Sequence, residues 1–182
     1  MMTQGLLVLL CMFTSALQAD MTPASTLDGT WKFVAEKSTD LATWRYRVLQ
    51  LEIATTDSQV RIVHQWMEGG AVAFADSFLF RPGGGKTSMD VHSEIWPDNW
   101  YMGVLAIKGS TKGVSGFWFE QGTILRVVTD QPVQTSQGRS VLTTSRVFRL
   151  NPDSSTLTLT EQRSSRPTPA VLIFERLQAR KP

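Results

Sequence analysis

Three titratable side chains lie close together in this sequence: Asp90, His92 and Glu94, spaced two residues apart. On a β-strand, residues with this spacing point to one face. An imidazole between two carboxylates offers ligands for a divalent metal and groups for acid–base catalysis. The other face of the same segment is apolar and consists of Met89, Val91 and Ile95. Because apolar side chains belong in the core, we expect the charged trio to face solvent, with a metal or proton-transfer site as the alternative.

The other histidine, His64, has apolar surroundings. It alternates with Val60, Ile62 and Trp66, so it shares their strand face and is expected to point inward. A single histidine in such surroundings is more often a hydrogen-bonded core residue than a ligand. The alternative is a polar group in the wall of a binding cavity.

Two charged residues also lie on apolar strand faces. Asp76 shares a face with Phe74 and Phe78, and Arg126 lies between two aliphatic residues of the same parity. A buried charge persists only when it is paired, so we expect each of them to point inward and to meet a partner. Whether they pair with each other is left open by the sequence.

Six tryptophans and nine phenylalanines are many for one small domain. A closed barrel of about eight strands or more either fills its interior with such rings or leaves a cavity that holds one small ligand. Core packing is the simpler interpretation. The cavity hypothesis predicts these ligand-binding residues: Trp31, His64, Trp66, Phe74, Asp76, Phe78, Trp118 and Arg126.

Glycines 83–85, with Lys86 and Thr87 after them, have the ending of a phosphate-binding loop. That motif requires glycine where Phe80 stands, and it requires a following helix where the sequence alternates as a strand. The segment is therefore expected to be a hairpin tip. The sequence contains no G-x-S-x-G motif, and two histidines without a motif indicate no Ser-His-Asp triad. It indicates neither a cofactor nor a metal.

Composition favours one globular domain. The chain has 182 residues, of which 42% are hydrophobic and 19% charged, and its net charge is +2. Two domains would be cramped at this length. Because the basic residues form no stripe, the composition argues against nucleic-acid binding.

Residues 1–19 are typical of a secretory signal peptide. They contain no charged side chain, their apolar run from Leu6 to Phe13 is too short to span a bilayer, and cleavage is expected after Ala19. Residues 20–26 are expected to be a flexible lead-in. Because the only cysteine, Cys11, lies in the signal, the mature chain has no thiol and no disulfide. We expect a periplasmic or secreted protein without stable membrane insertion.

Alternating hydrophobicity dominates the remainder of the chain. Turn-forming segments recur roughly every 8–12 residues and no helical period is convincing. The longest connection is expected at Asp130–Ser140, which is polar with one proline and one glycine. The pattern predicts an all-β fold: a single antiparallel up-and-down barrel of about 8–10 strands over residues 27–178.

Three short motifs carry a family resemblance. Leu27-Asp28-Gly29-Thr30-Trp31, with Lys37-Ser38 after it, resembles the G-x-W opening of lipocalin-like (calycin-type) barrels found in small secreted bacterial proteins. Val128-Thr129-Asp130 resembles the second lipocalin motif without its tyrosine, and Phe174-Glu175-Arg176 is similar to the closing strand. The resemblance implies that Trp31 closes the base and that a small, hydrophobic ligand binds inside.

Two other functions stay open at this point. An enzyme would use His64 with Asp76, or Asp90 with His92 and Glu94, and would bring these groups into one pocket. An envelope scaffold without ligand would instead expose a docking patch, for which the sequence offers Trp96 and Trp100.

Overall fold

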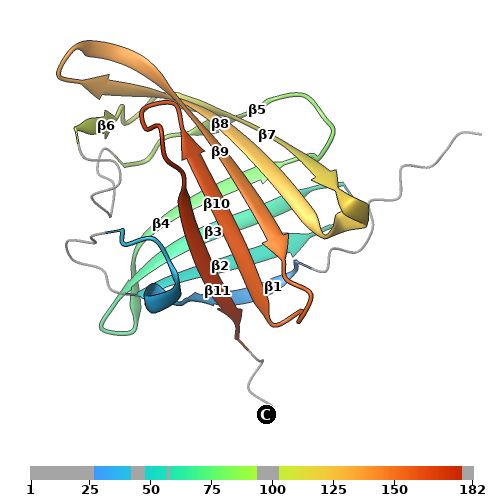
Figure 1. Ribbon diagram of the computed structural model, residues 1–182. Coiled ribbons are helices and arrows are strands. Elements are labelled where there is room, and N and C mark those ends of the chain that lie inside the picture. Colours follow the sequence, from blue (N-terminus) through green and yellow to red (C-terminus); the bar gives the residue numbers. More distant parts are fainter. Residues whose placement is uncertain (1–26, 42–47, 57, 94–102, 178–182) are drawn as a thin grey trace, which may run out of the picture.

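The protein is a nearly closed antiparallel β-barrel (Figure 1). The structure, a computed structural model, describes residues 27–41, 48–56, 58–93 and 103–177. In this part of the chain, eleven strands form a single sheet with two short 3-10 segments, which confirms the predicted all-β barrel. No helix among these residues is long and apolar enough to cross a membrane. The predicted signal peptide, the lead-in, Glu94, Trp96 and Trp100 lie outside the described residues.

Apart from the short strands β5 and β6, the strands follow one another around the wall, as expected for an up-and-down barrel. Their bounds are β1 (Gly29–Phe33), β2 (Val48–Thr55), β3 (Val60–Glu68), β4 (Ala71–Phe80), β5 (Thr87–Asp90), β6 (Val104–Ala106), β7 (Thr111–Phe119), β8 (Ile124–Thr135), β9 (Gly138–Leu150), β10 (Thr156–Arg163) and β11 (Ala170–Arg176), with 3-10 segments η1 (Ala35–Lys37) and η3 (Glu120–Gly122). The hydrogen-bonded order is β4-β3-β2-β1-β11-β10-β9-β8-β7-β5, and β6 pairs with β8. Pairing of β1 with β11 joins the two ends of the described chain.

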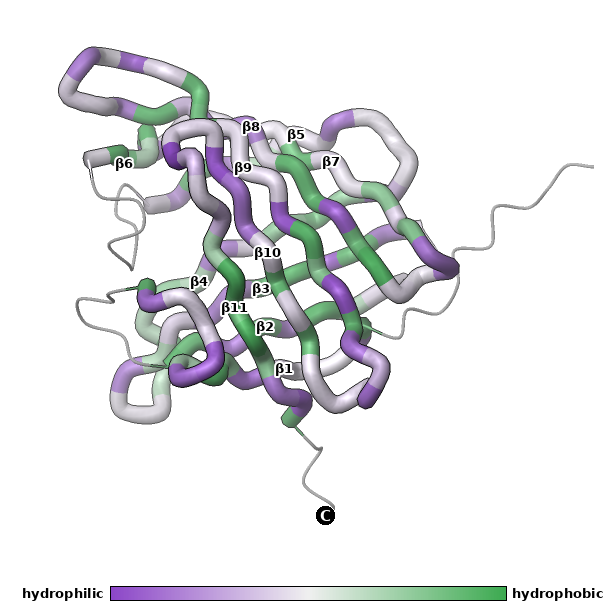
Figure 2. The backbone as a smooth tube through the Cα atoms, in the orientation of Figure 1, coloured by the Kyte–Doolittle hydropathy of each residue, from purple (hydrophilic) through white to green (hydrophobic). Residues whose placement is uncertain are grey.

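Side chains alternate between the interior and the outer surface along each strand. In β10, for example, Leu157 and Leu159 are buried while the alternating Thr156, Thr158 and Thr160 are only partly buried. Hydrophilic and hydrophobic residues accordingly alternate along the tube in Figure 2. This period of two is what the sequence pattern predicted.

The β8–β9 hairpin contradicts the predicted long connection at Asp130–Ser140. Both strands continue through this segment, Pro132 pairs with Val141, and the turn comes only between Thr135 and Gly138. The end of this hairpin projects beyond the barrel (Figure 1). Most residues of this segment are polar and resemble a loop in sequence, and within it only Val133 joins a small buried cluster, with Leu142 and Val104.

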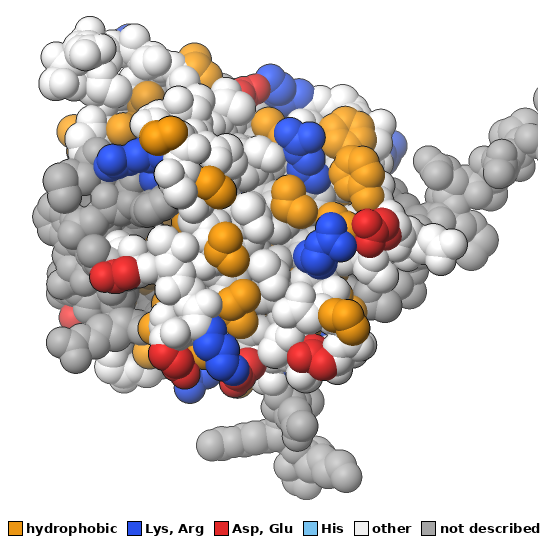
Figure 3. Space-filling view, viewed as in Figure 1, with side chains coloured by type: hydrophobic (Ala, Val, Ile, Leu, Met, Phe, Trp, Pro, Cys, Tyr) orange, Lys and Arg blue, Asp and Glu red, His pale blue; other side chains and the backbone are white. Residues whose placement is uncertain are grey.

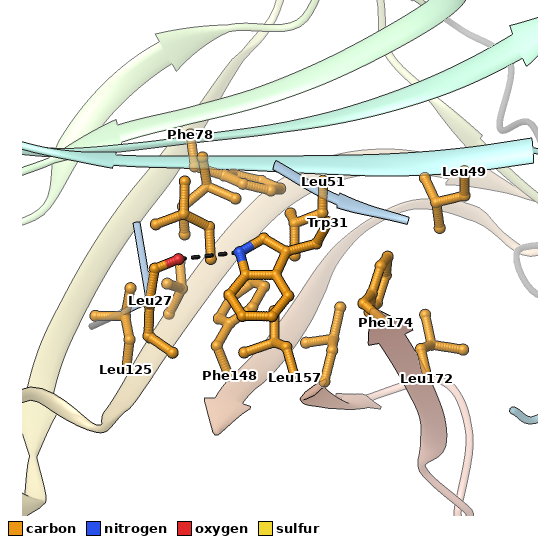
Figure 4. Close-up of a cluster of buried hydrophobic side chains, with 14 of the residues drawn as sticks. Leu27, Trp31, Leu49, Leu51, Phe78, Leu125, Phe148, Leu157, Leu172 and Phe174 are labelled. Atoms are coloured by element: carbon orange, nitrogen blue, oxygen red, sulfur yellow. Dashed lines mark hydrogen bonds between the residues drawn. The ribbon is translucent and has the colours of Figure 1, made fainter. Parts of the chain in front are cut away.

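Packed side chains fill the interior around Trp31, which is fully buried (Figure 4). Its indole Nε1 donates to the Leu27 carbonyl oxygen at 3.0 Å. The Arg176 guanidinium lies 4.0 Å from the indole ring centroid and donates to the Asp28 carbonyl oxygen at 2.6 Å. Other rings and aliphatic groups of this cluster include Leu51, Leu125, Phe148, Leu157 and Phe174. Trp31 therefore belongs to a packed core at this end of the barrel.

The barrel wall is interrupted at one place, which we call the seam: the gap in backbone pairing between β4 on one side and β5 with β7 on the other. At one end, the seam is closed by Phe80 of β4, because a Cβ at Gly116 would lie 2.1 Å from the Phe80 ring. The Gly83 N–H also donates to the Gly116 carbonyl oxygen at 2.8 Å. At the other end, the first half of β4 has no ladder partner across the seam among the described residues.

Candidate functional site

A pocket of about 190 Å³ lies at the open end of the seam. It is smaller than the roughly 300–1,000 Å³ that is typical of drug-sized ligand sites. β4 supplies one wall, and the segment that follows β5 supplies the opposite wall. Its lining residues are Phe74, Ala75, Asp76, Ser77, Met89, Asp90, Val91, His92, Ser93, Ala106, Lys112 and Gln131.

Asp76 finds its charge partner across the seam. Lys112 of β7 places its Nζ 2.5 Å from Asp76 Oδ1, and the Lys112 side chain is only 5% exposed, against 24% for Asp76. The ammonium also lies 4.6 Å from the centroid of the Phe78 ring, a cation–π contact. The expected inward orientation of Asp76 is thus confirmed, and its partner is a lysine that the sequence reasoning did not consider.

A second group of buried charges continues from this ion pair into the barrel. Arg146 Nε donates to Glu161 Oε2 at 2.7 Å, and its Nη1 donates to Thr129 Oγ1 at 3.1 Å. Arg163 Nε lies 4.0 Å from Glu161 Oε1. These residues, with His64, Asp76 and Lys112, form what we call the polar belt. Sequence reasoning missed this second group, although Glu161 and Arg163 share their strand parity with buried Leu157 and Leu159.

His64 is buried, as predicted, and lies opposite Asp76 in the β3–β4 register. Burial, with a further contribution from the positive charge of Arg146, lowers the pKa of His64 from 6.5 to about 4, despite the opposing charges of Asp76 and Glu161. The imidazole is therefore neutral at pH 7. Its Nε2 atom is buried and has no hydrogen-bond partner in the part of the chain that the structure describes, so the expected hydrogen bonding of a core histidine is not seen at this atom.

Aromatic rings surround His64 and extend to the pocket. The Trp66 ring lies 5.9 Å from the imidazole and 5.3 Å from Phe74, which lines the pocket. Phe78 lies 5.6 Å from the imidazole. Within the described ranges, neither Trp66 Nε1 nor Trp118 Nε1 has a hydrogen-bond partner, although both atoms are buried. Trp118 lies on β7 opposite Leu125, outside the pocket lining. The structure therefore brings His64, Trp66, Phe74 and Phe78 together and leaves Trp118 apart.

Arg126 does not point inward, which corrects the prediction. It is exposed, and its Nε donates to Ser145 Oγ at 3.1 Å on the outer face of the sheet. In β8, Leu125 and Val127 take the inward positions and are fully buried. The outer face around such residues is a mixture of apolar and charged side chains, as Figure 3 shows for one side of the barrel.

Asp90 and His92 are exposed, while Met89 packs against the core and Val91 is buried, as the alternation predicted. Both polar side chains nevertheless reach the pocket lining, together with Asp76. The enzyme alternative expected the titratable groups to meet in one pocket. Asp76, Asp90 and His92 do share the pocket lining, whereas His64 is not among the lining residues. Within the described ranges, no group of three or more His, Cys, Asp or Glu side chains is arranged to hold a metal ion.

The order of strands and the nearly closed wall define an antiparallel up-and-down β-barrel, which fits the predicted lipocalin-like (calycin-type) fold. The chain is similar in overall fold to a fatty-acid-binding protein from Manduca sexta, with a TM-score of 0.45 and 10% identity over 83% of this chain and 99% of that one. It is also similar to secretory abundant heat soluble protein 4 from Ramazzottius varieornatus, with a TM-score of 0.49 and 6% identity over 86% and 98%. No family model and no curated protein matches the sequence.

Proposed function

We propose that this protein binds a small, mainly apolar molecule non-covalently in the seam pocket. The observation that supports the proposal is the pocket itself: an opening in the barrel wall where Phe74, Met89 and Val91 supply apolar surface beside the Asp76–Lys112 ion pair. Binding sites of this kind combine apolar walls with a few placed polar groups.

In the proposed site, the predicted residues take different positions. Phe74 and Asp76 line it directly, and His64 and Trp66 lie opposite them on β3. Trp31 belongs to the packed core, and Arg126 is on the outer face, so we assign neither to the ligand.

The experiment uses a small, uncharged naphthalene dye whose emission depends on its environment. We expect saturable dye fluorescence with quenching of tryptophan emission. Ala106→Phe, which adds a ring to a buried lining residue, is expected to abolish uptake, while Ala73→Phe at an exposed position outside the lining leaves it unchanged. Absence of saturable uptake by the wild-type protein, or equal loss in both variants, would refute the proposal.

We also propose that the chain is exported and loses residues 1–19. The supporting features are the uncharged, apolar start of the chain and a mature sequence without cysteine. Cell fractionation followed by N-terminal sequencing tests this directly. An intact N-terminus in the cytosolic fraction would contradict it, independently of the result with the dye.

A further inference from the structure

We infer that the ligand of the seam pocket carries an uncharged oxygen, a hydroxyl or carbonyl group, that accepts a hydrogen bond from the indole N–H of Trp66. This inference rests on the proposed function and names the class of ligand.

Two buried polar atoms point to a missing hydrogen-bond partner. Trp66 Nε1 and His64 Nε2 are buried and have no hydrogen-bond partner among the described residues, and the two residues are only 7% and 6% exposed. Such groups are uncommon in folded proteins, because leaving a buried polar atom unpaired costs free energy. An indole N–H can only donate. The molecule that completes this site must therefore bring an acceptor.

The two atoms belong to residues next to the pocket wall. Trp66 and His64 lie directly opposite Phe74 and Asp76 in the β3–β4 register, and both of the latter line the pocket. Side chains opposite each other in an antiparallel pair have Cβ atoms about 4.5–5.5 Å apart. The Trp66 ring also lies 5.3 Å from the ring of Phe74, so the indole packs directly behind this lining residue.

The charges at the pocket disfavour a carboxylate. Asp76 and Asp90 face it with one lysine, Lys112, and that lysine is already ion-paired with Asp76. An anionic head group would approach a carboxylate without a free cation in the lining. An ammonium group would be attracted to the carboxylates but has no acceptor for Trp66. A neutral oxygen meets both conditions.

The other cations of the polar belt are the main reason to test a carboxylate. Arg146 and Arg163 both approach Glu161, and neither belongs to the pocket lining. Three cations therefore share two carboxylates within the belt, so an acid that reached beyond the pocket would be attracted there. Preference for a carboxylate is the outcome that would contradict the inference.

The test compares four six-carbon probes at pH 7: 1-hexanol, 1-hexanethiol, hexanoate and hexylammonium. Each competes with the uncharged naphthalene dye on the wild-type protein. We expect hexanol to displace the dye at a concentration roughly five- to tenfold below that of the other three, because sulfur is a weak acceptor and the charged heads are disfavoured. Equal or tighter displacement by hexanoate, or by hexanethiol, would overturn the inference.

Variants then locate the contact. Trp66→Phe keeps an aromatic ring and removes the N–H, so hexanol affinity should fall roughly five- to tenfold while dye affinity stays within twofold. The matched control is Trp118→Phe, which removes another buried indole N–H that has no hydrogen-bond partner among the described residues. Trp118 lies opposite Leu125, which does not line the pocket, so this change should leave hexanol affinity unchanged. Unchanged hexanol affinity in Trp66→Phe would refute the contact. If that variant does not fold, the wild-type probe series decides alone; a wild-type protein that takes up neither dye nor probes refutes the proposed function instead.

Discussion

The buried imidazole of His64 makes the stability of the fold depend on pH. Its pKa is lowered from 6.5 to about 4 in the folded protein. Between these two values the unfolded chain binds a proton at His64 that the folded chain does not bind. Acidification therefore favours the unfolded state, and stability falls as pH drops from above 6.5 toward 4.

The size of this effect follows from the two pKa values. The linkage relation gives a loss of about 2 kcal/mol between pH 7 and pH 5 and about 3 kcal/mol between pH 7 and pH 4. Other groups also make the free energy of unfolding depend on pH. The pKa of Asp130, for example, is lowered by hydrogen bonds from Lys86 and Thr143, so protonation of this carboxylate at lower pH also reduces stability. A comparison of variants is therefore needed to isolate His64.

The assay is urea unfolding at pH 7, 6, 5 and 4, followed by far-UV circular dichroism. His64→Phe places another ring beside Trp66 and Phe78 and removes the titratable group, so its stability should fall by about 3 kcal/mol less than that of the wild type over this range. The chain's other histidine supplies the control, because His92→Gln changes an exposed residue and should leave the wild-type pH dependence intact. Parallel pH profiles for the wild type and His64→Phe would refute the argument.

Three further predictions concern the seam and the outer face. Gly116→Ala should cost about 1–3 kcal/mol of stability in urea unfolding by forcing its Cβ against the Phe80 ring, and Phe80→Leu in the same chain should recover part of that loss. Lys112→Met should cost about 1–3 kcal/mol by leaving Asp76 without its cation, and the additional change Asp76→Asn should recover most of it; strict additivity would contradict the pairing. Arg126→Ala should change dye affinity less than twofold, because the side chain is exposed. A larger change in the affinity measured by dye titration would show that Arg126 contributes to binding.

The sequence predicted the inward orientation of His64 and Asp76 because strand parity is a local property. The same reasoning failed at Arg126. The segment Ile124–Val128 has apolar residues at both parities, so alternation alone does not say which set is buried. Pairing with β9 decides it: Leu125 lies opposite Phe148 and Arg126 opposite Val147, and only the first pair is fully buried.

The polar belt and the pocket depend on contacts between distant parts of the chain. The parity of Glu161 indicated that it faces the interior, but its ion pair with Arg146 follows from the β9–β10 register, which places the two residues directly opposite each other. The pocket exists because β4 ends the hydrogen-bonded order instead of pairing with β7 along its length. Local alternation carries no information about where a barrel leaves such a gap.

The contacts across the seam explain why the pocket lies at one end of it. Three contacts bridge the seam. The Gly83 N–H, in the turn after β4, donates to the Gly116 carbonyl oxygen at 2.8 Å; within β4, the Leu79 N–H lies 3.1 Å from Met89 Sδ, and Asp76 forms its ion pair with Lys112 at 2.5 Å. The first is supported by the close packing of a ring on a glycine, whereas the last joins two side chains without a backbone ladder. Asp76 and Lys112 therefore have two roles: they end the closed part of the seam, and they form the polar edge of the pocket. Lys112 of this ion pair lies over the Phe78 ring, and the Arg146 guanidinium lies 4.8 Å from the centroid of the same ring. The polar edge is therefore stabilised by both charge and packing. A ligand entering past Phe74 thus meets a fixed polar edge on one side and apolar surface on the other, which is the arrangement that orients an amphipathic molecule.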